Sequence, residues 1–412
     1  MTSRALAHFI FLFLFCSLAH ASYAGHMVAE VEKEWNIISN GTIRDATLDS
    51  SFLLVSPYQT ILEMNTTDGE LVRDGDSIRL HYTSPSLQTP KKIIATATIE
   101  VRYFPTMDSN PPLPNRTLAV SGYTNYTPSM AEFAHSYTQE SGGQLDAMVS
   151  LTEWVHKNVE YNTNFWGSAS PATEVYSGRE AVCVGYTHLL LALANSMGIE
   201  NRYASGYVFS DGWQQHAWAE FKIGEQWIPA DPTFEEFGYL DARRIASSYS
   251  SDQSGAVDRL SAKGGPFSFD TVVRIRISES TPFPPVANAY AAYDGTEFSV
   301  IISNAGSRYA TPSYIVTFPP YIHAEDSGIL FLPPGERQIL SYYLNTDALG
   351  GSSVYHIPYM VTMQGTEVSD TITYSRDLGT GSTEDQSSCP IALVLLSTLL
   401  FTTKSRRNYK HA

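Results

Sequence analysis

The sequence predicts an α+β protein in which one domain of helices and strands lies between two β-sandwich domains. Three observations support this fold class. Short stretches of alternating apolar and polar residues, separated by Gly, Asn and Asp, fill residues 28–104 and return over 270–375, as in antiparallel sandwiches. Residues 129–245 instead begin with helical periodicity and end with two strand-like runs. A chain of 412 residues has room for two to four domains.

The composition is that of a folded, acidic protein. The sequence is 43% hydrophobic and 17% charged, with a formal net charge of −16. It contains no basic face or arm that would bind phosphates, which disfavours a nucleic-acid role. It also has neither His/Cys pairs at zinc-binding spacing nor a Gly-rich phosphate loop. We therefore expect no metal and no cofactor.

Residues 1–24 are typical of a cleavable secretory signal. Arg4 gives a basic start, Phe9–Leu18 an apolar core, and Ala19-His20-Ala21 a small-x-small cleavage site, with Ser22-Tyr23-Ala24 as an alternative site. An uncleaved anchor is the other interpretation. Either way, the sequence predicts that the rest of the chain is exported.

The predicted N-terminal sandwich at 28–104 is followed by a connector at 105–128, which five prolines stiffen. Sequons for N-glycosylation lie in this first part of the chain, which predicts a glycoprotein if the host glycosylates. They are at Asn40, Asn65, Asn115 and Asn125.

Two helices are predicted next, over about 130–140 and 145–161. His156 on the second helix is expected to face solvent. The aromatic side chains of Tyr161 and Trp166 would line a groove or support an oxyanion site. Core packing is the alternative for at least one of them.

Three reactive residues stand out between Ser177 and Thr233. Cys183 lies in a helix-like run, His216 in a strand-like run, and Asp231 at the end of a second strand-like run. A thiol, an imidazole and a carboxylate could serve as a nucleophile, its base and the group that orients the base. Singly, each has a structural interpretation, as a buried apolar thiol, a sheet histidine or a turn residue.

The helical spacing of apolar residues begins near Val182, and Gly198 supplies a C-terminal stop. We therefore expect Cys183 at the start of this helix, where unpaired backbone N–H groups favour a thiolate. A capping-box pattern at Ser177 and Glu180 would start the helix earlier. Gly178 weakens that first turn, and the later start is preferred.

A hairpin is predicted to bring the imidazole and the carboxylate together. Strand-like runs at 218–221 and 226–230 flank a short turn, Lys222-Ile223-Gly224-Glu225. If the turn is centred between Ile223 and Gly224, His216 lies directly opposite Asp231, with the two side chains roughly 5 Å apart on one face. A register slip of one residue would separate them.

At these residues the chain resembles the transglutaminase-like superfamily, thiol enzymes related in site geometry to papain-like proteases. EAVCVGY with the following LLLALANSMGIENRYASGY, then HAWAEF and WIPADPT, carry the resemblance, and WVHKNVEYNT is similar to the helix that precedes the cysteine segment. The resemblance spans about residues 145–235. It implies a catalytic domain over 129–245 in which Cys183, His216 and Asp231 form the triad.

The remainder of the chain returns to strands and ends in a tail. Ser, Asp and Gly dominate 246–269, which predicts a long loop, and 270–375 predicts an immunoglobulin-like sandwich. A polar linker at 376–388 leads to 389–412, where Cys389, an apolar run and a basic end predict a membrane anchor or a sorting tail.

The cysteine count agrees with a functional thiol. Cys183 is the only cysteine between the signal and the tail, so it has no intramolecular disulfide partner there. The expected protein is thus an exported, membrane-anchored thiol enzyme of the cell surface that hydrolyses peptide or amide bonds of wall or surface proteins. The alternatives are a glutamine–amine cross-linking transglutaminase and a non-catalytic binding or scaffold protein. The oligomeric state stays open.

Overall fold

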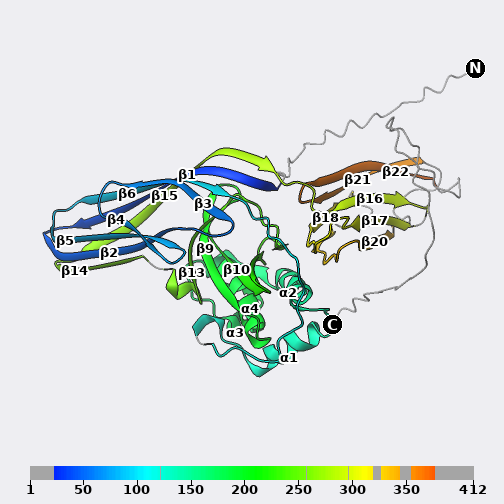
Figure 1. The fold of residues 1–412 in the computed structure, drawn as a ribbon, viewed down its shortest axis with the longest axis horizontal. Coiled ribbons are helices and arrows are strands. Elements are labelled where there is room, and N and C mark those ends of the chain that lie inside the picture. The colour runs from blue at the N-terminus through cyan, green and yellow to red at the C-terminus, as the bar shows by residue number, and fades with distance from the viewer. Residues whose placement is uncertain are drawn as a thin grey trace, which may run out of the picture.

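The structure is a computed structural model that describes residues 23–120, 122–256, 258–295, 297–318, 326–343 and 354–375. Three blocks follow one another along the long axis, a sandwich at each end and the helices in the middle (Figure 1). The α+β class with flanking β-domains is confirmed. The predicted signal, the linker at 376–388 and the tail at 389–412 lie outside the described residues, apart from Tyr23 and Ala24. Within the described part, no helix is long and apolar enough to cross a membrane.

The N-terminal sandwich consists of two four-stranded sheets, ordered β15-β1-β6-β3 and β14-β2-β5-β4. Alternate residues of each central strand point into a core that contains Trp35 and Phe52. The four sequon asparagines are exposed, and glycosylation stays a prediction. The first six strands are β1 (Ala24–Ser39), β2 (Ile43–Leu54), β3 (Gln59–Thr66), β4 (Glu70–Asp74), β5 (Ser77–Leu87) and β6 (Lys91–Val101).

The loop predicted at 246–269 is wrong, and so is the start of the second sandwich at 270. The segment contains the end of β13 (Arg244–Ser250), the short 3-10 helix η3 (Gln253–Gly255), β14 (Arg259–Gly264) and the start of β15 (Phe267–Pro282). β15 pairs with β1 from Ala24↔Pro282 to Ser39↔Phe267, and β14 pairs with β2. Both are edge strands, where one face meets water, so polar residues do not prevent pairing. The chain thus returns to complete the first sandwich.

The central domain packs four helices against the sheet β12-β11-β10-β9-β13. The helices are α1 (Pro128–Tyr137), α2 (Gln144–Asn158), α3 (Ala172–Gly178) and α4 (Cys183–Ser196), with short 3-10 turns η1 (Gly122–Thr124) and η2 (Thr163–Phe165). The sheet strands are β9 (Asn201–Phe209), β10 (Trp213–Ile223), β11 (Gln226–Asp231) and β12 (Glu236–Phe237), together with β13. β7 (Glu160–Tyr161) and β8 (Glu180–Ala181) form a short parallel pair beside them.

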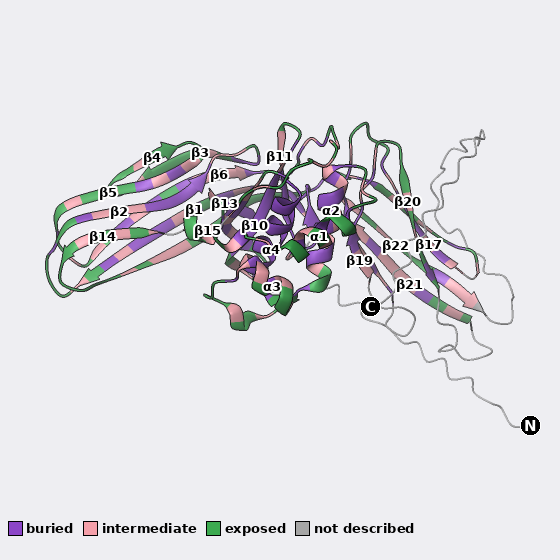
Figure 2. Cartoon of the chain, turned by 90° about the horizontal axis from the view of Figure 1, so that it is seen from below, coloured by how far each residue is buried: buried purple, intermediate pink, exposed green. Residues whose placement is uncertain are grey.

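Helix α4 is the centre of this domain, and buried residues gather around it and β10 (Figure 2). Every residue of α4 except Val184 is buried, because helices cover it on one side and the sheet on the other. Its C-terminus closes with backbone bonds from Gly198 N–H to the Asn195 carbonyl and from Ile199 N–H to the Ala194 carbonyl. Gly198 has φ +75°, which glycine adopts without strain. This fixes the axis along which Cys183 is presented.

The C-terminal sandwich has a three-stranded sheet, β16-β17-β20, and a four-stranded sheet, β19-β18-β21-β22. Its core includes Phe298, Val316 and Ile357. The immunoglobulin-like assignment of this domain stays a prediction. The strands are β16 (Asn288–Tyr293), β17 (Glu297–Ser303), β18 (Ser313–Thr317), β19 (Asp326–Ile329), β20 (Arg337–Tyr343), β21 (Val354–Met363) and β22 (Thr366–Ser375).

The segment 232–243 joins all three domains. From the C-terminal sandwich, Thr311 donates to the Phe237 carbonyl at 2.8 Å and Ser313 to the Glu235 carbonyl at 2.7 Å. From the N-terminal sandwich, the Ala24 carbonyl accepts from the Ala242 N–H at 2.7 Å. This segment directly follows Asp231, so both sandwiches contact the part of the chain that carries the candidate site.

Candidate active site

Cys183 is the first residue of α4, as the later helix start predicted. Val182 is its N-cap, in an extended conformation, and no side chain caps the helix. The backbone N–H groups of the first turn are therefore directed toward the thiol end of the helix. The cysteine is unbonded to any other cysteine and only 2% exposed.

His216 and Asp231 do contact each other, but not in the predicted register. The β10–β11 ladder runs from Ala219↔Ala230 to Ile223↔Gln226, so the turn residues are Gly224 and Glu225. Gly224 has φ +62°, the left-handed conformation that a two-residue hairpin turn requires at its first position. The predicted direct pairing of His216 with Asp231 is therefore wrong, because the observed register differs from the predicted one by two residues.

A shift of two residues keeps both side chains on the same face of the hairpin. They are diagonal neighbours, within reach of each other's side chains. His216 Nε2 lies 2.7 Å from Asp231 Oδ2, and both residues are buried. The sequence prediction of the contact holds although its register does not.

The surroundings of His216 favour its charged form. Burial alone would lower the pKa of this imidazole. The Asp231 carboxylate and a hydrogen bond with the Cys183 side chain have a larger, opposite effect and raise the pKa to about 9. Because Asp231 occupies Nε2, Nδ1 is the ring nitrogen left for Cys183. Phe234 lies edge-on to the ring, with centroids 5.3 Å apart, and Trp218 stacks on it at 6.4 Å. The imidazole is thus held between a carboxylate, a thiol and two aromatic rings.

Asp231 is fully buried and accepts hydrogen bonds on both carboxylate oxygens. Oδ2 accepts from His216 and from Arg244 Nη2, the latter at 2.5 Å, while Oδ1 accepts from the Thr233 N–H at 2.9 Å. Burial raises the pKa of the carboxyl, but the charges of His216 and Arg244 outweigh it and lower the pKa to about 2. Asp231 is therefore ionised throughout the neutral range.

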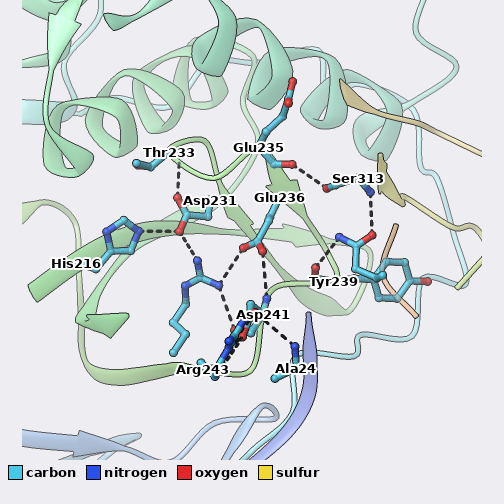
Figure 3. Close-up of polar contacts among 12 residues, drawn as sticks. Ala24, His216, Asp231, Thr233, Glu235, Glu236, Tyr239, Asp241, Arg243 and Ser313 are labelled. Atoms are coloured by element: carbon cyan, nitrogen blue, oxygen red, sulfur yellow. Dashed lines mark hydrogen bonds and ion pairs between the residues drawn. The ribbon is translucent and has the colours of Figure 1, made fainter. Parts of the chain in front are cut away.

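Arg244 on β13 continues this chain of contacts. Figure 3 shows Asp231, Glu236 and Asp241, the residues that it joins. Its Nη1 donates to Glu236 Oε2 at 3.1 Å and to the Asp241 carbonyl at 3.3 Å. Burial raises the pKa of Glu236 to about 7, despite the opposing charge of Arg244. Sequence reasoning missed both residues. A buried arginine requires a buried carboxylate partner, and the pair Glu235-Glu236, a few residues after Asp231, was the available signal.

Tyr161 is one of the aromatic residues close to Cys183. It is 43% exposed at the end of β7, and its hydroxyl forms a hydrogen bond with the Cys183 backbone. Burial, followed by the nearby Cys183 and Asp231, raises the pKa of its hydroxyl. Trp166 is 47% exposed, so neither residue is packed in the core.

The remaining histidines near the site have structural partners. His156, expected to face solvent, is only one-third exposed, and its Nδ1 lies 3.0 Å from the Pro232 carbonyl. His188 is buried in α4, between the Ser170 carbonyl and the Gln253 N–H, and stacks on Tyr123. No cluster of three His, Cys, Asp or Glu side chains suited to a metal ion occurs among the described residues.

Residues 131–232 match the model of the transglutaminase-like superfamily. The central domain is therefore a transglutaminase-like domain, as its resemblance implied.

A curated relative, the uncharacterised protein ML0607 of Mycobacterium leprae, is 30% identical over 97 residues. The match covers 21% of this chain and 34% of the relative, so it spans about a third of the relative's length. Among solved structures, a Cytophaga hutchinsonii protein assigned as a cysteine protease is 19% identical, with a TM-score of 0.48 over 63% of this chain and 93% of its own. The periplasmic domain of TgpA from Pseudomonas aeruginosa is 14% identical, with a TM-score of 0.30 over 51% of this chain and 88% of its own.

Proposed function

We infer that this protein is a thiol acyl-transfer enzyme with Cys183 as nucleophile, His216 as general base and acid, and Asp231 as the residue that orients His216. One observation carries the proposal. His216 Nε2 lies 2.7 Å from the Asp231 carboxylate, and the Cys183 side chain is among the groups that raise the pKa of His216. This places a base between a nucleophile and an orienting carboxylate, in a domain whose relatives include thiol enzymes.

The reaction follows from these contacts. The Cys183 sulfur attacks the carbonyl carbon of an amide, and the protonated His216 gives its proton to the departing amine as the C–N bond breaks. A thioester on Cys183 remains. Water or a second amine then attacks the thioester carbonyl, His216 takes the proton of the attacking group, and the thiolate leaves. Asp231 stabilises the imidazolium in both steps.

The oxyanion formed in each step would lie at the N-terminus of α4. The backbone N–H groups of the first turn of α4 lie there, and the Tyr161 hydroxyl beside Cys183 can donate a further hydrogen bond. We assign Tyr161 this role because its half-exposed ring leaves the hydroxyl accessible to substrate.

The substrate class proposed is a protein or peptide amide, with water as the acceptor. The signal-like residues 1–24 and the apolar–basic tail 389–412 support action outside the cytoplasm, on wall or surface proteins. With an amine as acceptor, the same thioester would make the enzyme a cross-linking transglutaminase. A non-catalytic scaffold would need none of the buried contacts of His216.

Incubation with a Gln-containing protein, with and without a labelled primary amine, tests the proposal. Release of ammonia or new amino termini without label indicates hydrolysis, whereas label in the protein indicates transamidation. Alkylation of Cys183 is expected to abolish either activity. Absence of both products over a panel of peptide and protein donors would favour the scaffold.

A further inference from the structure

We propose that Arg244 is a positioning residue of this site and that Glu236 acts on catalysis through it. Together they hold the Asp231 carboxylate toward His216 and set the net charge that His216 faces. The proposal rests on the proposed function for its effect on turnover, but its geometric basis is independent of any substrate.

His216 and Arg244 share one acceptor atom. His216 Nε2 and Arg244 Nη2 both contact Asp231 Oδ2, at 2.7 Å and 2.5 Å. Rotation of the carboxylate away from His216 would therefore also break its bond to a buried guanidinium. Arg244 is 1% exposed and Asp231 0%, so water is not on hand to replace either contact. A planar guanidinium fixes direction as well as distance, which the ammonium of a lysine does not.

Arg244 and Glu236 also determine the charge near His216. A cation beside Asp231 offsets the negative charge that stabilises the imidazolium of His216, and this would weaken the catalytic base. Glu236 removes that drawback. When Glu236 is ionised, the three residues Asp231, Arg244 and Glu236 carry a net charge of about −1; when it is protonated, they are about neutral. The imidazolium is then less stabilised.

Glu236 is placed to titrate in the working range. Burial raises its pKa to about 7, so it loses its proton as the pH rises through neutrality. The charged and titratable groups around this network are Asp231 from β11, Arg244 from β13, Asp241 and Arg243 between them, Glu235 beside it, Tyr23 before β1 and Tyr103 after β6. Of these, Arg244 is the group that joins Glu236 to the triad.

The neighbouring Arg243 supplies a matched control. It has the same side chain one position earlier, and its Nε donates to Asp241 Oδ1 at 2.9 Å. Its partner is a carboxylate that does not contact His216. A general effect of losing an arginine ion pair in this segment would appear in both variants, whereas positioning of Asp231 would appear only in Arg244.

The experiment measures two pH profiles, in the full chain, of Arg244→Gln, Arg244→Lys, Glu236→Gln and Arg243→Gln. One is kcat/KM with a peptide amide donor, and the other is the rate of Cys183 alkylation by iodoacetamide, which needs no substrate. We expect kcat/KM of Arg244→Gln to fall at least 100-fold, mainly in kcat, and Arg244→Lys to recover only part of this. For Glu236→Gln, kcat/KM should fall about tenfold at pH 8, and the titration step near pH 7 should be absent from both pH profiles. Arg243→Gln should stay within threefold of wild type.

Each outcome decides the proposal. Wild-type profiles in a folded Arg244→Gln, or in Glu236→Gln, would overturn it, as would an equal loss in Arg243→Gln. If Arg244→Gln does not fold, the isosteric Glu236→Gln carries the test alone. If no donor is turned over by wild type, the proposed function fails. The alkylation profiles still show whether Arg244 and Glu236 act on the Cys183–His216 pair.

Discussion

Two buried arginine–carboxylate networks border the same face of strand β10, and only one of them contacts a reactive group. His216, Trp218 and Glu220 alternate along this face. Glu220 is paired with Arg202, whose Nε and Nη2 reach Oε2 at 2.9 Å and 2.7 Å, while Tyr249 donates to Oε1 at 2.8 Å. The Arg202 guanidinium also lies over the rings of Trp227 and Tyr249.

In the Glu220 network, Arg202 and Tyr249 each contact a different carboxylate oxygen. Asp231 instead divides one oxygen between Arg244 and His216. Burial raises the pKa of Glu220 as it does that of Glu236. Burial, pairing and a shifted pKa are therefore common to both networks. The candidate site differs in that Asp231 Oδ2 accepts from both Arg244 and His216, and His216 also interacts with Cys183.

The largest expected effect is the loss of activity when Cys183 or His216 is replaced. Cys183→Ala and His216→Ala should each abolish acyl transfer, because one removes the nucleophile and the other removes its general base. The thermal unfolding midpoint of Cys183→Ala should move little, since the change is small. Turnover of peptide amides, measured beside thermal unfolding, checks both. A Cys183→Ala protein with near-wild-type turnover would remove this residue from the mechanism.

Matched amide substitutions in the two carboxylates come next. Asp231→Asn should lower kcat by about 10²–10⁴-fold, because the amide neither orients nor stabilises the imidazolium. Glu220→Gln should leave kcat within a few-fold but lower the free energy of unfolding by about 1–3 kcal/mol. Denaturant titration and steady-state kinetics on both variants provide the check. Equal activity loss in the two would show that buried charge in general, rather than contact with His216, matters.

A third prediction concerns pH. The pKa of His216 is raised to about 9, so the imidazolium is present below this value and is lost as the pH rises through it. Activity that depends on the imidazolium should therefore fall above about pH 9. Asp231→Asn should move this alkaline limb to lower pH, whereas Glu220→Gln should not. An unchanged limb in Asp231→Asn would mean that Asp231 does not set the charge of His216.

The smallest effect is expected at the contact with the C-terminal sandwich. Glu235 has φ +55°, and Ser327 holds its carboxylate with a hydrogen bond of 2.6 Å. Ser327→Ala should reduce kcat/KM by about two- to fivefold, the equivalent of about 0.5–1 kcal/mol in the placement of the segment after Asp231. Ser341→Ala, at an exposed position on β20 of the same sandwich, should have no effect. Equal kcat/KM values for the two variants would show that this contact with the C-terminal sandwich does not affect catalysis.

Local sequence signals predicted the parts of the site that depend on short-range structure. The start of α4 at Cys183 followed from apolar spacing and a weak first turn. The contact of His216 with Asp231 followed from a short Gly-containing hairpin, although Gly224 and Glu225 form the turn and shift the register by two residues. The contact survived because alternation along a strand repeats every two residues.

The parts that the sequence did not predict depend on long-range pairing. Nothing local in 259–282 indicates that β14 and β15 return to the first sandwich, more than 200 residues away, and the polar residues of β14 resemble a loop. Arg244 was missed for the same reason. Its partners Asp231 and Glu236 come from other strands of the central domain, and only the assembled sheet brings the three together.

The most direct test of the account is to identify the residue that carries the acyl group during turnover. Wild-type protein is mixed with a p-nitrophenyl ester, quenched in acid within one turnover and digested for mass spectrometry. The account predicts a hydroxylamine-labile acyl group on the peptide that contains Cys183. It also predicts slower formation in Asp231→Asn and wild-type formation in Glu220→Gln. Turnover with no acyl group on Cys183, or with the group on another residue, would contradict it.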